Sequence, residues 1–173
     1  SFMDPQYWKA SIKSSKVITN CYSTSFSIGI KVLDKKIHDA IYAIYGFVRL
    51  ADEIVDTFHE QNKKQLLEDF KQETYASVKR KLSLNPALHS FQWVVNKYNV
   101  ETELIDGFLK SMELDLTQTI SSVQGFKEYV YGSAEVVGLM CLRVFCEGDE
   151  KKYQELKPAA QYLGSAFQKI NFL

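Results

Sequence analysis

The chain has 173 residues, 46% of them hydrophobic and 13% aromatic, which suits one substantial core rather than two. Its 21 Lys and Arg residues balance 21 Asp and Glu residues, so no net charge attracts it to nucleic acid or to an anionic membrane. No run approaches the roughly 18 apolar residues of a membrane span, and no signal pattern begins the chain. We expect one cytoplasmic domain over residues 1–173, with Ser1 and Phe2 left over from cloning.

Glycine and proline are scarce, with 8 and 3 residues, and no glycine lies between Gly46 and Gly107. This composition disfavours a turn-rich β fold and favours long helices. We expect Asp34 and Ser122 to cap helices and Pro158 to lie in the first turn of the last helix. The sequence therefore predicts an all-α helical bundle, with helices at residues 5–17, 23–31, 35–57, 62–83, 87–98, 101–119, 125–146 and 150–172.

The clearest periodicity lies in the predicted helix 35–57, where apolar residues recur at spacings of four and three. This spacing predicts the core stripe of an amphipathic helix, formed by Ile37, Ile41, Ile44, Val48, Ala51 and Val55. A second row follows one position later, formed by Tyr45, Arg49, Asp52 and Asp56. Because this row adjoins the core stripe, we expect it to face the inside of the bundle or a cleft.

Asp52 and Asp56 lie four residues apart on one helical face, so their carboxylates repel each other unless a cation compensates them. Mg²⁺ suits such a pair, because it prefers few protein carboxylates together with oxygens of a substrate phosphate. Arg49 offers a planar set of donors for a phosphate oxygen. The alternative is a solvated helix edge with an Arg49–Asp52 surface pair. Asp69 and Glu73 have the same spacing, and we assign them no role.

Three blocks of the sequence resemble the squalene/phytoene synthase family. The YSTSFS segment at residues 22–27, with AIYAIYGFVR at 40–49 and ADEIVD at 51–56, is similar to its N-terminal signature and first aspartate-rich motif. Residues 129–140 resemble its Tyr-rich helix, and QKIN at 168–171 resembles the opening of its second aspartate-rich motif. The resemblance spans nearly the whole chain and implies a helical bundle of the isoprenoid synthase type.

The resemblance also implies a reaction, the head-to-head condensation of two prenyl diphosphates through a cyclopropyl diphosphate, with Mg²⁺ as cofactor. It implies that Asp52 and Asp56 ligate Mg²⁺, and that Arg49 and Tyr129 are catalytic with them, Tyr129 lying next to the reacting carbons. The residues implied to bind the substrate are Tyr22, Ser23, Thr24, Ser25, Tyr45, Arg49, Gln168 and Asn171. Candidate walls of an apolar tunnel are Phe26, Ile30, Val136, Val137, Leu142 and Phe167.

The chain departs from the family pattern in two places. Glu135 stands where many relatives carry glycine, and the sequence stops at Leu173, just before the family's second carboxylate pair. We therefore expect the C-terminal helices of the fold to be missing and this chain alone to be impaired in catalysis. We also expect a homodimer through the apolar surface left exposed. Residues 112–116, which include Asp115, are also similar to the family, and we expect Asp115 to be structural.

The choice of substrate depends on residues 132–140, which are more similar to bacterial phytoene synthases. This similarity implies geranylgeranyl diphosphate as substrate and a place in carotenoid biosynthesis. One alternative is a squalene or dehydrosqualene synthase that uses farnesyl diphosphate. Others are a terpene cyclase, a chain-elongating prenyltransferase, and a non-catalytic helical interaction domain. A hydrophobic substrate would also bring the protein to a membrane surface as a peripheral protein.

Overall fold

The computed structural model describes residues 4–23, 29–58, 61–117 and 123–172, with only the backbone described at 123 and 165–172. The described residues form helices and no strand, which confirms the predicted all-α class. In chain order these are α1 (Pro5–Tyr22), η1 (Lys35–Ile37), α3 (His38–Asp56), α4 (Lys63–Arg80), α5 (Pro86–Tyr98), α6 (Thr102–Thr117), α7 (Val123–Val130), the π-helical η3 (Tyr131–Glu135), α8 (Val136–Cys146) and α9 (Glu150–Phe172).

Two predictions about helix ends are wrong. α1 continues to Tyr22, beyond the predicted end at residue 17, and Ser23 terminates it, whereas a new helix was predicted from that residue. α9 begins at Glu150, so Pro158 lies inside that helix and not in its first turn. The rest of the predicted helix 23–31 lies largely outside the described residues, although residues 29–31 are helical.

Short polar side chains begin several helices, because they accept hydrogen bonds from backbone amides that have no partner within the helix. Asp34 accepts from the Lys36 amide and confirms the predicted cap of η1, whereas Ser122 lies outside the described residues. Asn85 accepts from two amides of α5, which has Pro86 in its first turn, where a missing N–H costs little. The chain therefore specifies these starts locally.

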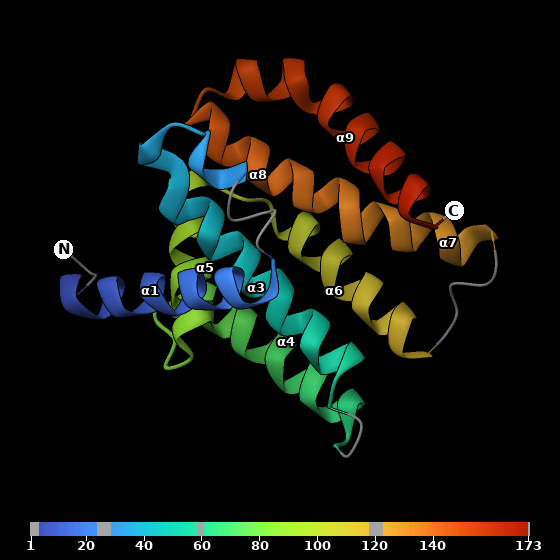
Figure 1. Ribbon diagram of the computed structural model, residues 1–173, viewed down its shortest axis with the longest axis horizontal. Coiled ribbons are helices and arrows are strands. Elements are labelled where there is room, and N and C mark those ends of the chain that lie inside the picture. The colour runs from blue at the N-terminus through green and yellow to red at the C-terminus, as the bar shows by residue number, and fades with distance from the viewer. Residues whose placement is uncertain (1–3, 24–28, 59–60, 118–122, 173) are drawn as a thin grey trace.

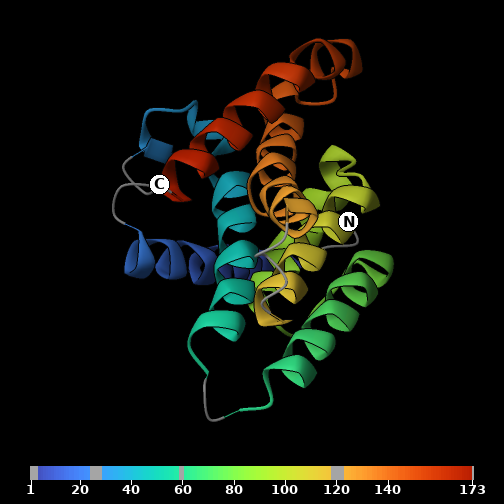
Figure 2. The same ribbon diagram turned by 90° about the vertical axis from the view of Figure 1, so that its right-hand side faces the viewer.

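α3 runs through the centre of the bundle, with α1, α4, α5, α6 and α8 packed around it (Figures 1 and 2). The predicted apolar stripe is buried, except that Val48 is half-buried. The most enclosed aromatic ring of α3 is that of Phe47, which is 0% exposed and lies beside the apolar stripe, on the side away from the polar row. Its ring stacks on Phe91 at 3.8 Å between centroids and contacts Phe70 and Phe108 at 5.4 and 5.2 Å. This aromatic cluster ties α3 to α4, α5 and α6.

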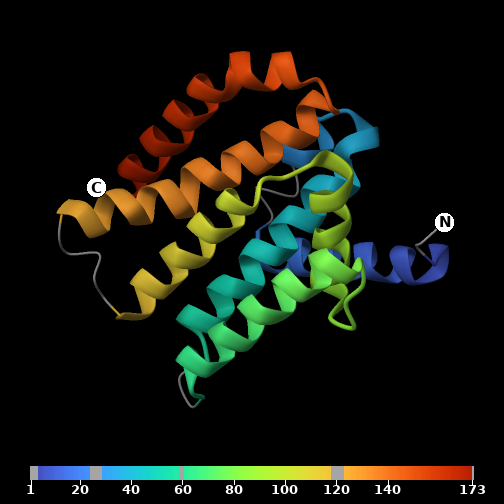
Figure 3. The same ribbon diagram turned by 180° about the vertical axis from the view of Figure 1, so that it is seen from behind.

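α7, η3 and α8 form one continuous helical stretch that lies between α6 and α9 (Figure 3). Residues 124–146 of this stretch have the length and composition of a membrane span. The core helix of a soluble protein passes the same test, and Val136, Leu139 and Met140 of α8 are almost fully buried here. The expectation that no such segment exists is therefore too strong, while the packing accounts for the segment's apolar character.

The π-helical segment η3 lies very close to α6. A Cβ atom at Gly132 would overlap the carbonyl oxygen of Gly107 and approach the Cβ of Ser111 to 2.6 Å. Only glycine lets the two helices approach this closely, because the nearest atoms belong to backbone that cannot rotate away. Gly132 thereby fixes the position of α6 relative to the stretch that carries Tyr129.

We expect Gly132→Ala to destabilise the fold by about 1–3 kcal/mol, because the added methyl group overpacks the contact with α6. Gly138→Ala is the matched control, since the nearest atom to its Cβ is 3.6 Å away. Alanine there should stabilise α8 by about 0.5–1 kcal/mol. Urea unfolding followed by circular dichroism measures both changes. Equal midpoints for the two variants would contradict this account.

Candidate active site

The polar row of α3 lies at the end of the helix where the chain turns toward α4. Tyr45, Arg49 and Asp52 are half-buried, and Asp56, the last residue of α3, is exposed. α3 therefore presents one carboxylate inside the bundle and one at its rim. The predicted proximity of this row to the interior is confirmed for Asp52.

The carboxyl group of Asp52 is held in an unfavourable environment. Burial raises its pKa to about 6, and Arg49 opposes this rise, while the negative charges of Asp56 and Asp115 add to it. The pKa of Asp115, from α6, is also raised, first by burial and then by Asp56, while Lys63 opposes the rise. Three carboxylates from α3 and α6 thus repel one another across the end of the bundle.

Tyr129 of α7 belongs to the same group of side chains. Its pKa is raised by burial and then by the charges of Asp115, Asp52 and Asp56. The structure therefore brings together Asp52, Asp56 and Tyr129, which the sequence selected, and adds Asp115, which the sequence analysis took as structural. No short-range pattern could have linked Asp115 to Asp52, because the two lie on separate helices and meet only through packing.

Arg49 does not form the surface pair with Asp52 that the alternative interpretation expected. Its Nη2 donates to the carboxylate of Glu53 instead, and its guanidinium lies 4.4 Å from the ring centroid of Tyr22. Its buried Nε has no hydrogen-bond partner among the described residues. Arg49 therefore keeps a donor for an acceptor that the described residues do not supply.

The remaining predicted residues are placed unevenly. Tyr22, at the end of α1, is half exposed, and the backbone N–H of Ser23 caps α1 by donating to Thr19 at 2.9 Å. Thr24, Ser25 and Phe26 lie outside the described residues, and only backbone is described for Phe167, Gln168 and Asn171. The helix that carries these last residues packs on η3 and α7, beside the stretch that carries Tyr129.

The predicted tunnel residues that the structure describes are apolar core residues. Ile30, Val136 and Leu142 are buried, and Val137 is partly buried against the same core. They lie within one hydrophobic cluster with α3, so an apolar environment adjoins the polar row.

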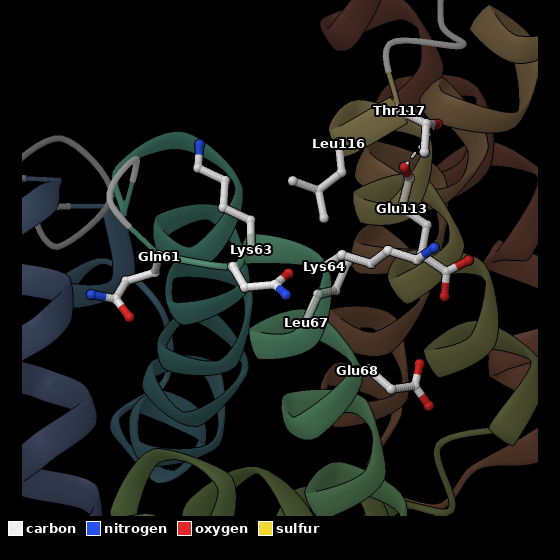
Figure 4. Close-up of a pocket in the computed structure, with 9 residues that line it drawn as sticks. Gln61, Lys63, Lys64, Leu67, Glu68, Glu113, Leu116 and Thr117 are labelled. Carbon is white, nitrogen blue, oxygen red and sulfur yellow. Dashed lines mark hydrogen bonds between the residues drawn. The ribbon is translucent and has the colours of Figure 1, made fainter.

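Lys63 connects the polar row to a pocket between α4 and α6. Its Nζ donates to the backbone carbonyl of Val55 at 2.5 Å, in the last turn of α3, and its charge acts on Asp115. The pocket has a volume of about 590 Å³, with Leu67 and Leu116 as its apolar lining (Figure 4). Its other lining residues are Gln61, Asn62, Lys63, Lys64, Glu68, Glu113 and Thr117.

The carboxylates of the polar row are the candidate ligands for Mg²⁺. No group of three His, Cys, Asp or Glu side chains in the described part of the chain is arranged to hold a metal ion without further ligands. Asp52 and Asp56 nevertheless supply hard oxygen donors, and a divalent cation would offset both the burial that raises the pKa of Asp52 and the smaller effect of its like-charged neighbours. The donor set therefore fits Mg²⁺ bound together with phosphate oxygens.

Two solved structures share the fold of this chain. A dehydrosqualene synthase in complex with a ligand superposes with a TM-score of 0.80 at 23% identity, over 97% of this chain and 58% of that one. The squalene synthase HpnC from Alicyclobacillus acidocaldarius superposes with a TM-score of 0.81 at 17% identity, over 97% of this chain and 62% of that one. The fold is thus of the isoprenoid synthase type, and the chain spans less than two thirds of either neighbour.

The family follows from the sequence. The model of the squalene/phytoene synthase family matches residues 19–173, which is most of the chain, so this protein belongs to that family. A search of curated proteins found no match. The matched region includes all of the described residues that surround Asp52, apart from those of α1 before residue 19.

We expect Asp52→Asn to stabilise the metal-free chain above pH 7, because a carboxyl whose pKa is raised in the folded state is penalised when it is charged. The gain should be on the order of 1 kcal/mol, about 2–4 °C in Tm. It should fade as the pH falls through about 6 and be largely lost near pH 4, where the folded-state carboxyl is protonated and the unfolded-state carboxyl is about half protonated.

Thermal unfolding in EDTA from pH 4 to pH 8 checks this expectation. Asp69→Asn is the control, because Asp69 lies exposed on α4 and makes only a local hydrogen bond with Gln65. A Tm difference for Asp52→Asn that is independent of pH would show that the carboxyl is not held in an unfavourable environment.

Proposed function

We propose that the protein catalyses the Mg²⁺-dependent head-to-head condensation of two prenyl diphosphates. The observation that carries this proposal is the group of carboxylates at the end of α3, where the half-buried Asp52 lies near Asp56 and Asp115 and burial with these like charges raises its pKa despite Arg49. Membership of the squalene/phytoene synthase family supports the same reaction class. The chain would carry the half of the site that contains the first aspartate-rich motif.

In this proposal Asp52 and Asp56 hold Mg²⁺, and Asp115 contributes charge from the opposite helix. Bound Mg²⁺ would supply Lewis acidity toward the leaving diphosphate. The Nε–H group of Arg49 would donate a hydrogen bond to a diphosphate oxygen, and its position is fixed before the ligand binds. The other substrate-binding residues are proposed to be Tyr22, Ser23, Thr24, Ser25, Tyr45, Gln168 and Asn171.

Tyr129 is proposed to act where the carboxylates and the apolar core meet. Burial and the three nearby carboxylates raise the pKa of its hydroxyl, so the phenol stays protonated at neutral pH. A neutral phenol can donate a hydrogen bond to diphosphate and present its ring to an allylic cation, an attraction of about 0.5–2 kcal/mol. The buried apolar residues Ile30, Val136 and Leu142 would exclude water from that cation.

The proposed substrate is geranylgeranyl diphosphate, giving phytoene, because residues 132–140 resemble bacterial phytoene synthases. A second candidate is farnesyl diphosphate with squalene or dehydrosqualene as product. It is supported by the two structural neighbours, which are described as a dehydrosqualene synthase and a squalene synthase. The two candidates differ by five carbons, so the depth of the apolar site separates them.

We further propose that the protein is cytoplasmic and approaches membranes peripherally to collect its substrate. α9 carries exposed apolar side chains, with Tyr162 73% and Leu163 66% exposed. This face would also serve as the surface of the homodimer that the sequence suggested. Light scattering of the purified chain measures its oligomeric state.

We expect the chain to bind a non-ionisable geranylgeranyl thiodiphosphate only when Mg²⁺ is present, because the carboxylates repel a free diphosphate. Asp52→Asn and Asp56→Asn should each weaken this binding by more than about tenfold, and Asp115→Asn by a smaller factor. Isothermal titration calorimetry measures the affinities, with farnesyl thiodiphosphate as the comparison ligand. Tighter binding of one ligand selects between the two candidate substrates.

Asp69→Asn is again the control, because Asp69 and Glu73 share the spacing of Asp52 and Asp56 but lie on α4, away from the polar row. The control should bind like the unsubstituted chain. Binding that is independent of Mg²⁺, or equal losses in Asp52→Asn and Asp69→Asn, would overturn the proposed function.

A further inference from the structure

Glu53 lies between the two proposed metal ligands in sequence but in a different environment. Its side chain is 8% exposed and accepts a hydrogen bond from Nη2 of Arg49. Asp52, the adjacent residue, is half-buried and forms no such pair with Arg49 in the described residues. Because a helix turns by about 100° per residue, consecutive side chains point in different directions. Glu53 therefore faces a set of partners that Asp52 does not share.

Those partners are donors that favour the charged form of Glu53. Arg49 forms an ion pair with it one helical turn away, and the side chains of Thr57 and Tyr22 are hydrogen-bonded to it. Tyr22 contacts Arg49 as well, through its ring at 4.4 Å from the guanidinium. Glu53, Arg49 and Tyr22 thus touch one another pairwise, and Tyr22 brings the end of α1 into the group.

This arrangement restrains the guanidinium on one edge and one face. Glu53 binds Nη2, and the ring of Tyr22 covers the plane of the group. Nε is buried and has no hydrogen-bond partner in the described part of the chain. A buried donor without a partner costs about 1–3 kcal/mol of free energy. A ligand acceptor that forms this hydrogen bond would recover that cost on binding.

The ion pair with Glu53 also keeps Arg49 away from Asp52. The two are three residues apart on α3, a spacing at which side chains meet. If Arg49 were released it would pair with Asp52 and compete with a cation for that carboxylate. Glu53 therefore serves two groups, since it orients the arginine and leaves the aspartate available.

We propose that Glu53 and Tyr22 are positioning residues, which hold Arg49 so that its Nε is presented to the diphosphate of the substrate, and that Glu53 is not a metal ligand. This inference rests on the proposed function. It gives Tyr22 a second task beside the substrate contact proposed for it above. It also makes the end of α1 part of the site through a contact with Arg49.

The first test is a double-mutant cycle on binding of geranylgeranyl thiodiphosphate in Mg²⁺, measured by calorimetry. Glu53→Gln keeps the shape of the side chain but weakens the hold on Arg49, and it should lower the affinity roughly tenfold. In a chain that carries Arg49→Met, the same substitution should cause no further loss, because Glu53 acts through Arg49. An equal loss in both backgrounds would show that Glu53 contacts the metal or the ligand itself, and would overturn the inference.

Tyr22 offers a second test that does not disturb a buried charge. Tyr22→Phe keeps the ring over Arg49 and loses only the hydroxyl, whereas Tyr22→Leu loses both contacts. We expect the affinity to fall more in Tyr22→Leu than in Tyr22→Phe, with Tm unchanged in both because the side chain is half exposed. Equal affinities for the unsubstituted chain and Tyr22→Leu would contradict the role of the ring.

A third readout needs no ligand and separates this inference from the proposed function. The Nε–H signal of Arg49 in a ¹⁵N NMR spectrum, assigned by its loss in Arg49→Met, should be protected from exchange and should lose protection in Glu53→Gln. Glu73→Gln is the matched control, because it removes a carboxylate that pairs with Arg80 on the exposed side of α4. It should leave the Arg49 signal unchanged.

The outcomes then differ for the two claims. If no thiodiphosphate binds the unsubstituted chain, the proposed function fails. A protected Arg49 signal that depends on Glu53 would still support the positioning of Arg49 by Glu53. If thiodiphosphate binds but the Arg49 signal is unprotected, or is the same in Glu53→Gln, the positioning role fails and the proposed function stands.

Discussion

The enclosure of α3 by five neighbouring helices is the constraint on which the rest of this structure depends. An isolated amphipathic helix buries one stripe and leaves its polar residues in water. α3 instead buries Phe47 and Glu53 along with its stripe and half-buries Asp52, because α1, α4, α5, α6 and α8 pack around it. Its polar side chains must therefore be paired with other groups of the protein or with a bound ligand.

Asp52 and Glu53 show how this enclosure assigns roles. Both are carboxylates on the same turn, yet the pKa of one is raised by burial and like charges and that of the other is lowered by an arginine. The group with a satisfied charge is suited to hold structure in place. The group with an unsatisfied charge is suited to bind a cation, and the difference comes from their surroundings rather than from their chemistry.

The sequence predicted the elements that depend on local order. The apolar stripe of α3, the cap at Asp34 and the DxxxD spacing are all local patterns of the sequence, so they can be recognised without a fold. Asp115 and Lys63 could not be found in this way, because they join the site from α6 and α4 through packing. The length of α1 was also missed, because Thr19, Asn20 and Cys21 near its end have low helix propensity.

The direction of α3 has a consequence of its own. Aligned peptide dipoles place a partial negative charge at the carboxyl end of a helix, where anionic side chains are disfavoured by about 0.3–1 kcal/mol each. Asp56 is the last residue of α3, Asp52 and Glu53 lie one turn before it, and the last turn of α3 itself contains no basic residue. The ammonium group of Lys63 on the Val55 carbonyl offsets only part of this charge. Any cation that binds there would therefore interact favourably with the helix dipole as well as with the side chains. The free energy of unfolding would then rise with the concentration of that cation.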